Sequence, residues 1–473
     1  MGTSNPKSQS FLALASRGAG VGLKFLYTLL LAKLLGATDM GLYTLALSVA
    51  SMGTLISGFG FENPTVRLIA KYRISQESER INGLLIMVSF FVVASGLVIC
   101  SFVILGAGFI SNSVFHKPEL YTPLILIAGS VIAFSLFNIF NGALRGIGLG
   151  ERAVFLQNVV VPFCGIILFL LLFYLGKRVT GASIAYLLSS LAAASLSFLL
   201  VAKYIKISIA GKFPPLKEVM RDSGEFFSLS VINGLQNWIG IYIIGICMAS
   251  QDVGIFRVVS SIAILISLPI QSVNDVLPPA IVKYHTSSQM SRLQDVLVEN
   301  SRWILSVSLP VFIIVTLFPR YILSFFGKDF GDGNYALIIL SVGYLFNSFM
   351  GTVGLVLRMT DNQRYIVKAR AIVLMSSIGL YYFFTKEYGL IGAASVFTAA
   401  IIIMNIWNAI SMRRLLGIRS YTLNVKDLLA ATIAAIFVMM LVKVSFGSTL
   451  LALLVFSVTY LLMTRKIVFK SVF

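Results

Sequence analysis

The sequence predicts an all-α polytopic membrane protein of about fourteen transmembrane helices, arranged as two six-helix lobes related by pseudo-two-fold symmetry plus two C-terminal helices. Three observations support this fold class. The 473-residue chain is 58% hydrophobic and only 12% charged, with a mean hydropathy of +0.93, which is too apolar for a soluble globular protein. Apolar runs of roughly 20 residues recur along its whole length. Short motifs also repeat at a nearly constant separation.

Each apolar run is long enough to cross about 30 Å of hydrocarbon as a helix. The first run carries charges and is not followed by a small-residue cleavage site, so we expect it to be retained rather than removed as a signal peptide. The predicted spans are residues 11–35, 42–61, 82–106, 121–143, 154–175, 181–202, 226–248, 254–276, 303–326, 335–357, 366–385, 389–411, 427–445 and 447–464.

The distribution of positive charge predicts the orientation. The net charge of +19 could suggest a nucleic-acid partner, but the cations are unevenly divided between the two sides of the membrane. With the amino terminus in the cytoplasm, 26 of the 37 Lys and Arg lie in or near inner loops and 9 in or near outer ones. This is the positive-inside pattern of membrane proteins. We therefore expect both termini in the cytoplasm and no nucleic-acid partner.

Cysteine, histidine and glycine patterns exclude several classes of protein. The three cysteines, Cys100, Cys164 and Cys247, fall within predicted spans and form no CxxC pair, so neither a disulfide framework nor a zinc site is expected. His116 and His285 lie far apart in predicted loops. The chain has no GxxxxGK[ST] phosphate-binding loop, which excludes ATP hydrolysis by that motif. We expect no cofactor, no metal and no enzymatic activity.

Four pairs of motifs indicate a tandem duplication. GATDMGLY after the first span matches ASQDVGIF after the seventh, which places Asp39 against Asp252 at a separation of 213 residues. Three later pairs keep the same order at separations of 211 to 213: IAKY with IVKY, LR with LR, and GASIAY with GAASVF. Six spans per copy is an even number, so both copies enter the membrane in the same sense. Parallel repeats of this kind are a transporter architecture, with the substrate path between the halves.

The duplication predicts the domain boundaries. We expect an N-terminal lobe over residues 1–205, a cytoplasmic linker over 206–224, a C-terminal lobe over 225–415 and two additional helices over 416–473. The polar stretch around the linker, Lys203 to Glu225, carries five cations and two prolines. Attraction to anionic headgroups is the simplest explanation of those charges.

Arg17 and Lys24 are the strongest candidates for substrate binding. They lie seven residues apart inside the first span, so both project from one face of the helix. Ionisable groups within a bilayer cost a few kcal/mol and usually line a bundle interior or a water-filled cavity. Two cations on one face predict an anion site. The alternative is that both side chains reach the membrane surfaces or pair with acids of a neighbouring helix.

Polar residues in other spans extend this candidate site. The seventh span carries Asn233 and Asn237, and by the repeat Asn237 occupies the place of Lys24. The alternative is that such amides only hold helices together. The remaining candidates for substrate contacts are one residue of the fourth span and three of the eighth: Asn141, Arg257, Gln271 and Asn274.

Six charged residues near the ends of spans are predicted to have structural or gating roles. Asp39 and Asp252 begin helices after tight turns, where a carboxylate can cap free N–H groups. Glu62 and Asp275 correspond across the repeat and could pair with cations when the inner mouth closes, or simply lie at the interface. The equivalent arginines of spans four and ten, which could also serve only to set topology, complete the set: Arg145 and Arg358.

The stretches LLLAKLLGATDMGLYTLALSV, PTVRLIAKY and GALRGIG resemble the polysaccharide flippases of the Wzx type. Their superfamily also holds the bacterial lipid II flippase and the multidrug and toxin extruders, and the resemblance covers essentially the whole chain. It implies translocation of oligosaccharide repeat units, of O-antigen or a related surface polysaccharide, linked to undecaprenyl pyrophosphate. In relatives, cations of the first helix and the turn aspartate matter for function, which here implicates Arg17, Lys24 and Asp39.

The resemblance also implies a location and partners. The protein is expected in the bacterial cytoplasmic (inner) membrane. Its expected partners are the lipid-linked oligosaccharide and membrane lipids, and a polysaccharide polymerase and a chain-length regulator are further candidates. Two alternatives remain. A cation-coupled multidrug antiporter would share the fold but needs a buried acid. A membrane glycan polymerase or ligase usually has a large outer loop, whereas the longest outer segment here, near Phe109 to Tyr121, is short.

Overall fold

The structure is a computed structural model that describes residues 6–205, 212–421, 426–446, 455–460 and 462–464. Within these ranges the chain is helical and contains no strand. It forms two compact units, one ending at Val258 and the other beginning at Val259. The predicted all-α membrane fold is confirmed.

Ten helical segments among the described residues are long and apolar enough to cross a membrane. Two of them each combine two of the predicted spans, joined at a kink where a glycine leaves the helical conformation. These glycines are Gly36, with φ 81° and ψ 173°, and Gly389, with φ 58° and ψ −137°. Near the carboxyl end lie two shorter apolar helices, Ala430–Met440 and Val455–Thr464. The count of fourteen spans stays a prediction.

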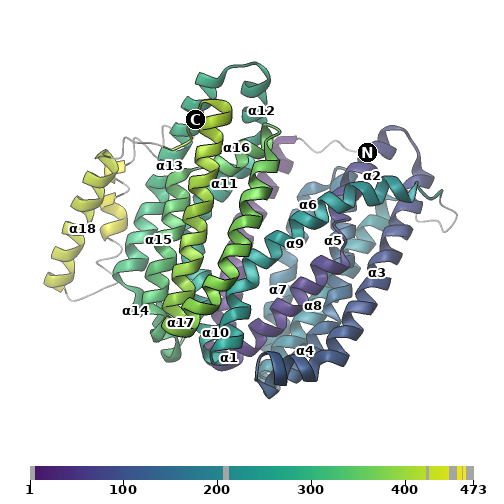
Figure 1. The fold of residues 1–473 in the computed structure, drawn as a ribbon, viewed down its shortest axis with the longest axis horizontal. Helices are drawn as coiled ribbons and strands as arrows, with labels where there is room; N and C mark the ends of the chain where they lie inside the picture. The colour runs from purple at the N-terminus through teal and green to yellow at the C-terminus, as the bar shows by residue number, and fades with distance from the viewer. Residues whose placement is uncertain (1–5, 206–211, 422–425, 447–454, 461, 465–473) are drawn as a thin grey trace. The chain divides into compact units, whose positions relative to one another are not determined.

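Unit 1 begins with the long kinked helix α1, and Figure 1 shows α3, α4, α5 and α8 packed side by side within the same unit. Two π-helical turns, η1 and η3, and one short 3₁₀ turn, η2, interrupt the α-helices. The elements in chain order are α1 (Pro6–Ser57), α2 (Glu62–Ile74), α3 (Ser78–Phe109), η1 (Ile110–Val114), η2 (Pro118–Leu120), α4 (Tyr121–Ala128), α5 (Ser130–Gly146), α6 (Gly150–Phe155), η3 (Leu156–Val160), α7 (Val161–Tyr174), α8 (Val179–Tyr204), α9 (Leu216–Cys247) and α10 (Ser250–Ala263, which continues past the boundary).

In unit 2, α13 packs on α15 and α15 on α17, as Figure 1 also shows. The elements are η4 (Ile264–Ser267), α11 (Leu268–Val276), α12 (Pro278–Thr286), α13 (Met290–Leu317), α14 (Pro319–Ser324), η5 (Lys328–Gly333), α15 (Asn334–Met350), α16 (Val353–Met359), α17 (Gln363–Leu416) and α18 (Lys426–Phe446).

The surface of α3 shows the composition expected of a helix that contacts lipid. Its side chains Phe90, Phe102, Leu105 and Phe109 are between 67% and 86% exposed in the protein alone. Large apolar side chains at this density would be unusual on the surface of a soluble protein. Such side chains are normal on the lipid-facing surface of a transmembrane helix.

The predicted duplication recurs in the backbone. Gly148 and Gly176 have positive φ, and so do Asp361 and Gly389, which lie 213 residues further on in each case. The pair Gln76 and Ser288 repeats the pattern at a separation of 212. Left-handed turns are uncommon for residues other than glycine, so their recurrence at the spacing of the sequence repeat supports two copies of one helical unit.

The compact units divide the chain differently from the predicted lobes. The part of α9 from residue 225 and the part of α10 up to Val258 were expected in the second lobe, yet they belong to unit 1 and α9 packs on α1. Tyr242 of α9, for example, donates its hydroxyl proton to the carbonyl oxygen of Ser48 at 2.9 Å. The lobe boundaries at residues 205 and 225 stay a prediction, and residues 206–211 of the predicted linker lie outside the described residues.

The two matched turns of the repeat cross each other within unit 1 with almost no space between them. A Cβ atom added to Gly41 would lie 1.7 Å from the carbonyl oxygen of Ser250. A Cβ atom added to Gly254, its counterpart in the second copy, would lie 2.0 Å from the carbonyl oxygen of Ala37. The backbones can approach this closely only because both positions are glycine. We call this contact the glycine crossing.

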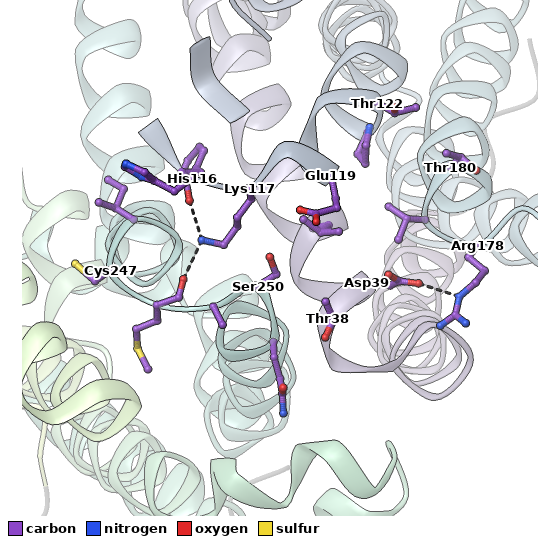
Figure 2. A pocket seen from close by; sticks show the side chains of 18 of the residues that line it. Thr38, Asp39, His116, Lys117, Glu119, Thr122, Arg178, Thr180, Cys247 and Ser250 are labelled. Atoms are coloured by element: carbon purple, nitrogen blue, oxygen red, sulfur yellow. Dashed lines mark hydrogen bonds and ion pairs between the residues drawn. The ribbon is translucent and has the colours of Figure 1, made fainter. Parts of the chain in front are cut away.

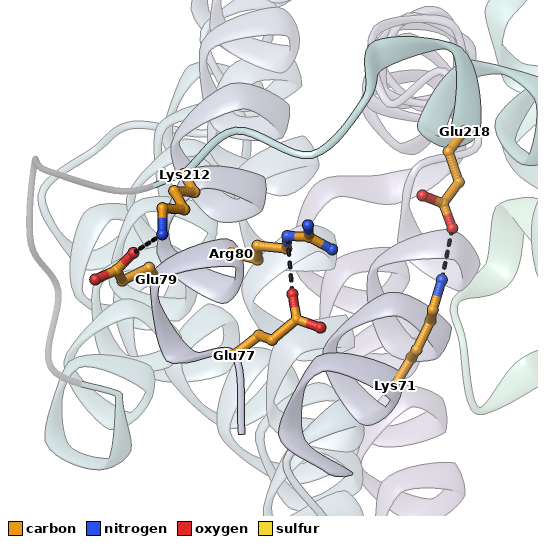
Figure 3. A network of polar contacts seen from close by, with 6 residues as sticks. All are labelled: Lys71, Glu77, Glu79, Arg80, Lys212 and Glu218. Carbon is orange, nitrogen blue, oxygen red and sulfur yellow. Dashed lines mark hydrogen bonds and ion pairs between the residues drawn. The ribbon is translucent and has the colours of Figure 1, made fainter. Parts of the chain in front are cut away.

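The chain that leads into α9, together with the first turns of that helix (residues 212–227), forms a strap across α2 and α3. Figure 3 shows its two ion pairs with the rest of unit 1, from Lys212 to Glu79 at 3.2 Å and from Glu218 to Lys71 at 2.9 Å. A Cβ atom added to Gly83 of α3 would lie 2.3 Å from the carbonyl oxygen of Lys212, so the strap passes directly over that helix. Lys212 therefore has a partner within the protein, not only the headgroups that the sequence suggested.

Candidate functional site

The candidate site is centred on Lys24 of α1, whose ammonium group donates a hydrogen bond of 2.8 Å to the Oδ1 atom of Asn158. Both Lys24 and Arg17 are exposed on unit 1. A charged hydrogen bond to a neutral amide orients the ammonium without neutralising it. Lys24 therefore keeps its positive charge available at the surface of a span that is otherwise apolar.

Asn158 is the residue of this site that the sequence did not single out. It lies in the π-helical turn η3, which interrupts the span formed by α6 and α7. Its Nδ2 group donates to the carbonyl oxygen of Val154 at 3.1 Å, so its Oδ1 faces Lys24. Such π-helical turns are frequent at functional sites. The sequence signal was the polar pair Gln157 and Asn158 within an apolar run.

Gly20 allows α1 to approach η3 closely enough for this contact. A Cβ atom added to Gly20 would lie 2.5 Å from the Cβ atom of Asn158 and 2.8 Å from its carbonyl oxygen. By contrast, Gly18 and Gly22 on the same helix have no such neighbour within 4 Å. Gly20 is therefore the glycine of this stretch whose missing side chain has a structural purpose.

This contrast predicts the outcome of two matched substitutions. Gly20→Leu should lower the free energy of unfolding by about 1 to 3 kcal/mol, the usual cost of overpacking, because a backbone atom of Asn158 blocks the new side chain. Gly22→Leu should leave it unchanged or raise it slightly, since leucine favours a helix more than glycine does. The midpoint of thermal unfolding of each purified variant in detergent measures the difference. Equal midpoints would contradict the close packing at Gly20.

The predicted residues of α9 and α10 are on the same unit as Arg17 and Lys24. The side chain of Asn237 is exposed and that of Asn233 is half-buried. The Arg257 guanidinium lies over the Trp238 ring, 5.7 Å from its centroid. Two side-chain amides and one guanidinium therefore lie on the unit that carries Arg17 and Lys24.

Asn141 is placed differently from the other candidates of this unit. It lies inside unit 1, only 2% exposed, with its Oδ1 atom unpaired.

The remaining two candidates belong to unit 2. Gln271 is exposed and donates to the hydroxyl of Ser267 at 3.4 Å, whereas Asn274 is half-buried with an unpaired Oδ1 atom. The structure thus brings Arg17, Lys24 and the candidates of α9 and α10 onto one unit, and buries Asn141 beneath its surface.

Two of the predicted gating residues pair with each other in unit 1. Arg145 of α5 contacts the carboxylate of Glu62 at the start of α2. Packing at two glycines holds these helices together: a Cβ atom added to Gly142 or Gly146 would lie 2.9 Å from an atom of α2. The counterparts in unit 2, Asp275 and Arg358, are both exposed.

The two turn aspartates have different partners. The carboxylate of Asp252 accepts a hydrogen bond of 3.1 Å from the backbone N–H of Ala249, the kind of contact a capping residue makes. Asp39 instead accepts a bond of 2.9 Å from the Nε atom of Arg178. Arg178 also donates to the carbonyl oxygen of Leu35 at 2.8 Å, next to the kink at Gly36. Asp39 thus fixes the kink through an arginine that the sequence did not indicate.

The described residues contain no cluster of three or more histidine, cysteine or acidic side chains that could hold a metal ion. The described carboxylates of unit 1 lie at the ends of helices, in the turns between them or, for Asp39, beside the kink of α1.

Comparison with solved structures shows the fold. The lipid II flippase MurJ in an inward closed conformation is similar with a TM-score of 0.74 and 18% identity, over 98% of this chain and 99% of that one. An inward-facing multidrug resistance MATE family transporter of the MOP superfamily gives 0.68 and 19%, over 82% and 94%. A MOP superfamily transporter from Pyrococcus furiosus gives 0.62 and 16%, over 88% and 96%.

Comparison with curated proteins finds no match. A family model described as "Polysaccharide biosynthesis protein" matches residues 8–285, more than half of the chain and all of the candidate site in unit 1. The resemblance seen in the sequence is therefore confirmed. The chain belongs to the polysaccharide biosynthesis protein family, as a multi-pass membrane protein with the fold of the MOP superfamily transporters.

Proposed function

We propose that this protein is a flippase that moves undecaprenyl-pyrophosphate-linked oligosaccharide repeat units from the inner to the outer leaflet of the bacterial cytoplasmic membrane. The observation that carries the proposal is the exposed pair Arg17 and Lys24 on an apolar helix, with Lys24 oriented by Asn158. Membership of the polysaccharide biosynthesis family supports a glycan-linked substrate.

The pyrophosphate diester is the part of the substrate that the membrane resists most. It carries about two negative charges, and an unpaired charge in hydrocarbon is strongly unfavourable. Arg17 and Lys24 would pair with it, while the polyprenyl chain stays in lipid. Across an inside-negative membrane, moving two negative charges outward is favourable by roughly 4 to 5 kcal/mol per 100 mV. The membrane potential can therefore drive the step.

Three candidate residues of unit 1 would contact the sugars. Asn233, Asn237 and Arg257 would offer amide and guanidinium groups that replace water around hydroxyls. Gln271 and Asn274 of unit 2 stay predictions from the sequence for the same role. The Glu62–Arg145 pair would belong to the inner gate, and alternating access would expose the site to each leaflet in turn. The transport cycle makes or breaks no covalent bond of the substrate, so the protein would not act as an enzyme.

A deletion strain tests the proposal against its two alternatives. We expect the deletion to abolish surface polysaccharide and to trap the lipid-linked repeat unit in the inner leaflet, where an impermeant glycan-modifying reagent cannot reach it. Export of single units with loss of long chains would instead indicate a polymerase or ligase. Increased drug sensitivity with normal export would indicate a multidrug antiporter. Cross-linking in the wild-type strain would show whether a polymerase or chain-length regulator is a partner.

A further inference from the structure

Unit 1 contains a pocket that is separate from Lys24 and is built from four turns. It has a volume of about 870 Å³ and is lined by residues within 38–42, 115–123, 176–180 and 246–251. We call it the turn pocket. In the predicted orientation these segments follow spans one, three, five and seven, so all four lie on the outer side of the membrane. The volume is within the roughly 300 to 1,000 Å³ typical of pockets for small molecules.

The floor of the turn pocket is fixed by backbone contacts. The glycine crossing lies beneath it, because Ser250, which contacts Gly41, is also a lining residue. On one wall, Lys117 is only 8% exposed. Its ammonium donates to the carbonyl oxygens of Phe115, at 2.9 Å, of Met248, at 2.8 Å, and of Gly245. One side chain thus ties the loop before α4 to the last turn of α9.

Burial lowers the pKa of the Lys117 ammonium, and the nearby carboxylate of Asp252 partly opposes this shift. A cation at the carboxyl end of a helix is also favoured by the helix dipole. The neighbouring His116 has φ 55°, a left-handed conformation that is uncommon for residues other than glycine. Such backbone strain persists only where the surroundings enforce it. The turn pocket is therefore a preformed feature.

The lining carries two cations and two carboxylates, and Asp39 and Arg178 pair with each other. Figure 2 shows Lys117 on one side of the pocket and the Asp39–Arg178 ion pair on the other, with Glu119 between them. A phosphate group would have to compete with the carbonyl oxygens that hold Lys117 and with the carboxylate of Asp39. It would also meet the negative charge of Glu119. This arrangement disfavours an anion.

A neutral sugar fits the same lining well. Sugar hydroxyls both donate and accept, so they can bond to a carboxylate and a guanidinium that are already paired with each other. Hydroxyls of Thr38 and Ser250 lie between the charged walls in Figure 2. Ile246, which is 40% exposed, adds apolar surface, against which the C–H face of a sugar ring can pack. A few convergent polar groups on an apolar lining are the usual composition of a specific ligand site.

We propose that the turn pocket binds uncharged sugar residues of the glycan on the outer side of the membrane, separately from the cationic site for the pyrophosphate. The identity of the sugar as part of the transported glycan rests on the proposed function. The pocket would hold the head of the glycan after it has crossed, and so favour outward movement over return.

Cys247 lines the turn pocket and provides a native reporter. We would use full-length protein in lipid nanodiscs with Cys100→Ser and Cys164→Ser, and measure the rate at which a maleimide labels Cys247. The probe is the lipid-free repeat-unit oligosaccharide from the host's own polysaccharide. It should slow labelling several-fold, whereas inorganic pyrophosphate or sorbitol at the same concentration should not. Protection by pyrophosphate alone, or none by the oligosaccharide, would overturn the proposal.

Two variants of one loop sharpen this test. Arg178→Gln should weaken protection by about tenfold or more, since a charged hydrogen bond is lost. Lys177→Gln removes the same charge from the next residue, which is exposed and does not line the pocket, and should have no effect. If Arg178→Gln does not fold, the exposed Glu119→Gln serves instead. An equal effect of both loop variants would contradict a specific site.

This experiment is independent of transport, because the free oligosaccharide binds without being moved. Loss of glycan export in the deletion strain, with no protection of Cys247, would overturn the turn pocket and leave the flippase proposal standing. Protection of Cys247, with unchanged glycan export in the deletion strain, would overturn the flippase proposal and leave a sugar-binding pocket.

Discussion

Lys24→Ala is expected to abolish detectable export of the lipid-linked glycan while the protein still inserts into the membrane, and Arg17→Ala should do the same. Loss of a charged hydrogen bond to the pyrophosphate is worth about 1.5 to 3 kcal/mol, or about a tenfold to hundredfold fall in rate for each residue. The low dielectric of the membrane interior makes the upper end the better expectation. Surface polysaccharide in the complemented deletion strain measures the effect.

Lys33→Ala is the matched control for this prediction. Lys33 is an exposed lysine of the same helix, three residues before the kink at Gly36, and its loss should leave export intact. Asn158→Ala should give an intermediate rate, because Lys24 keeps its charge but loses its orienting partner. Full export by both Lys24→Ala and Arg17→Ala, with normal protein levels in the membrane, would exclude the anion site.

Gly41→Leu and Gly254→Leu are expected to have the largest effects on stability. The new side chains would meet backbone oxygens at 1.7 and 2.0 Å, and neither oxygen can move aside without separating the helices. Overpacking usually costs about 1 to 3 kcal/mol when side chains can rearrange, so a clash with rigid backbone should exceed that range. Membrane protein level and the midpoint of thermal unfolding in detergent report the loss.

Gly379→Leu provides the comparison, because this glycine of α17 is exposed and has no neighbour within 4 Å of an added Cβ atom. It should unfold at the wild-type midpoint. A wild-type midpoint for Gly41→Leu as well would mean that α1 and α10 can separate at no cost, and the glycine crossing would then have no structural importance.

The sequence was sufficient for the fold class and the repeat, because both follow from local composition and from spacing along the chain. Motifs repeat in the sequence at separations of 211 to 213 residues, and residues with positive φ repeat in the backbone at separations of 212 and 213. The anion site at Arg17 and Lys24 stays a prediction, because exposure of the two side chains does not by itself distinguish it from cations that reach the membrane surface.

What could not be predicted depends on contacts between distant segments. The partner of Lys24 is set by a π-helical turn and by the missing side chain of Gly20, neither of which has a periodic signal. The pairing of Asp39 with Arg178 joins residues 139 positions apart. Asn141 and the exposed Asn237 are both asparagines within apolar spans, and only the packing of α5 distinguishes the buried one.

The glycine crossing has an evolutionary consequence. Each copy presents its own glycine to the first turn of the other, so the contact is the same viewed from either side. Self-complementary contacts of this kind are characteristic of homodimers with two-fold symmetry. The ancestor of this protein would then have been a six-helix chain that worked as a pair of identical subunits, and gene fusion later joined an interface that already existed.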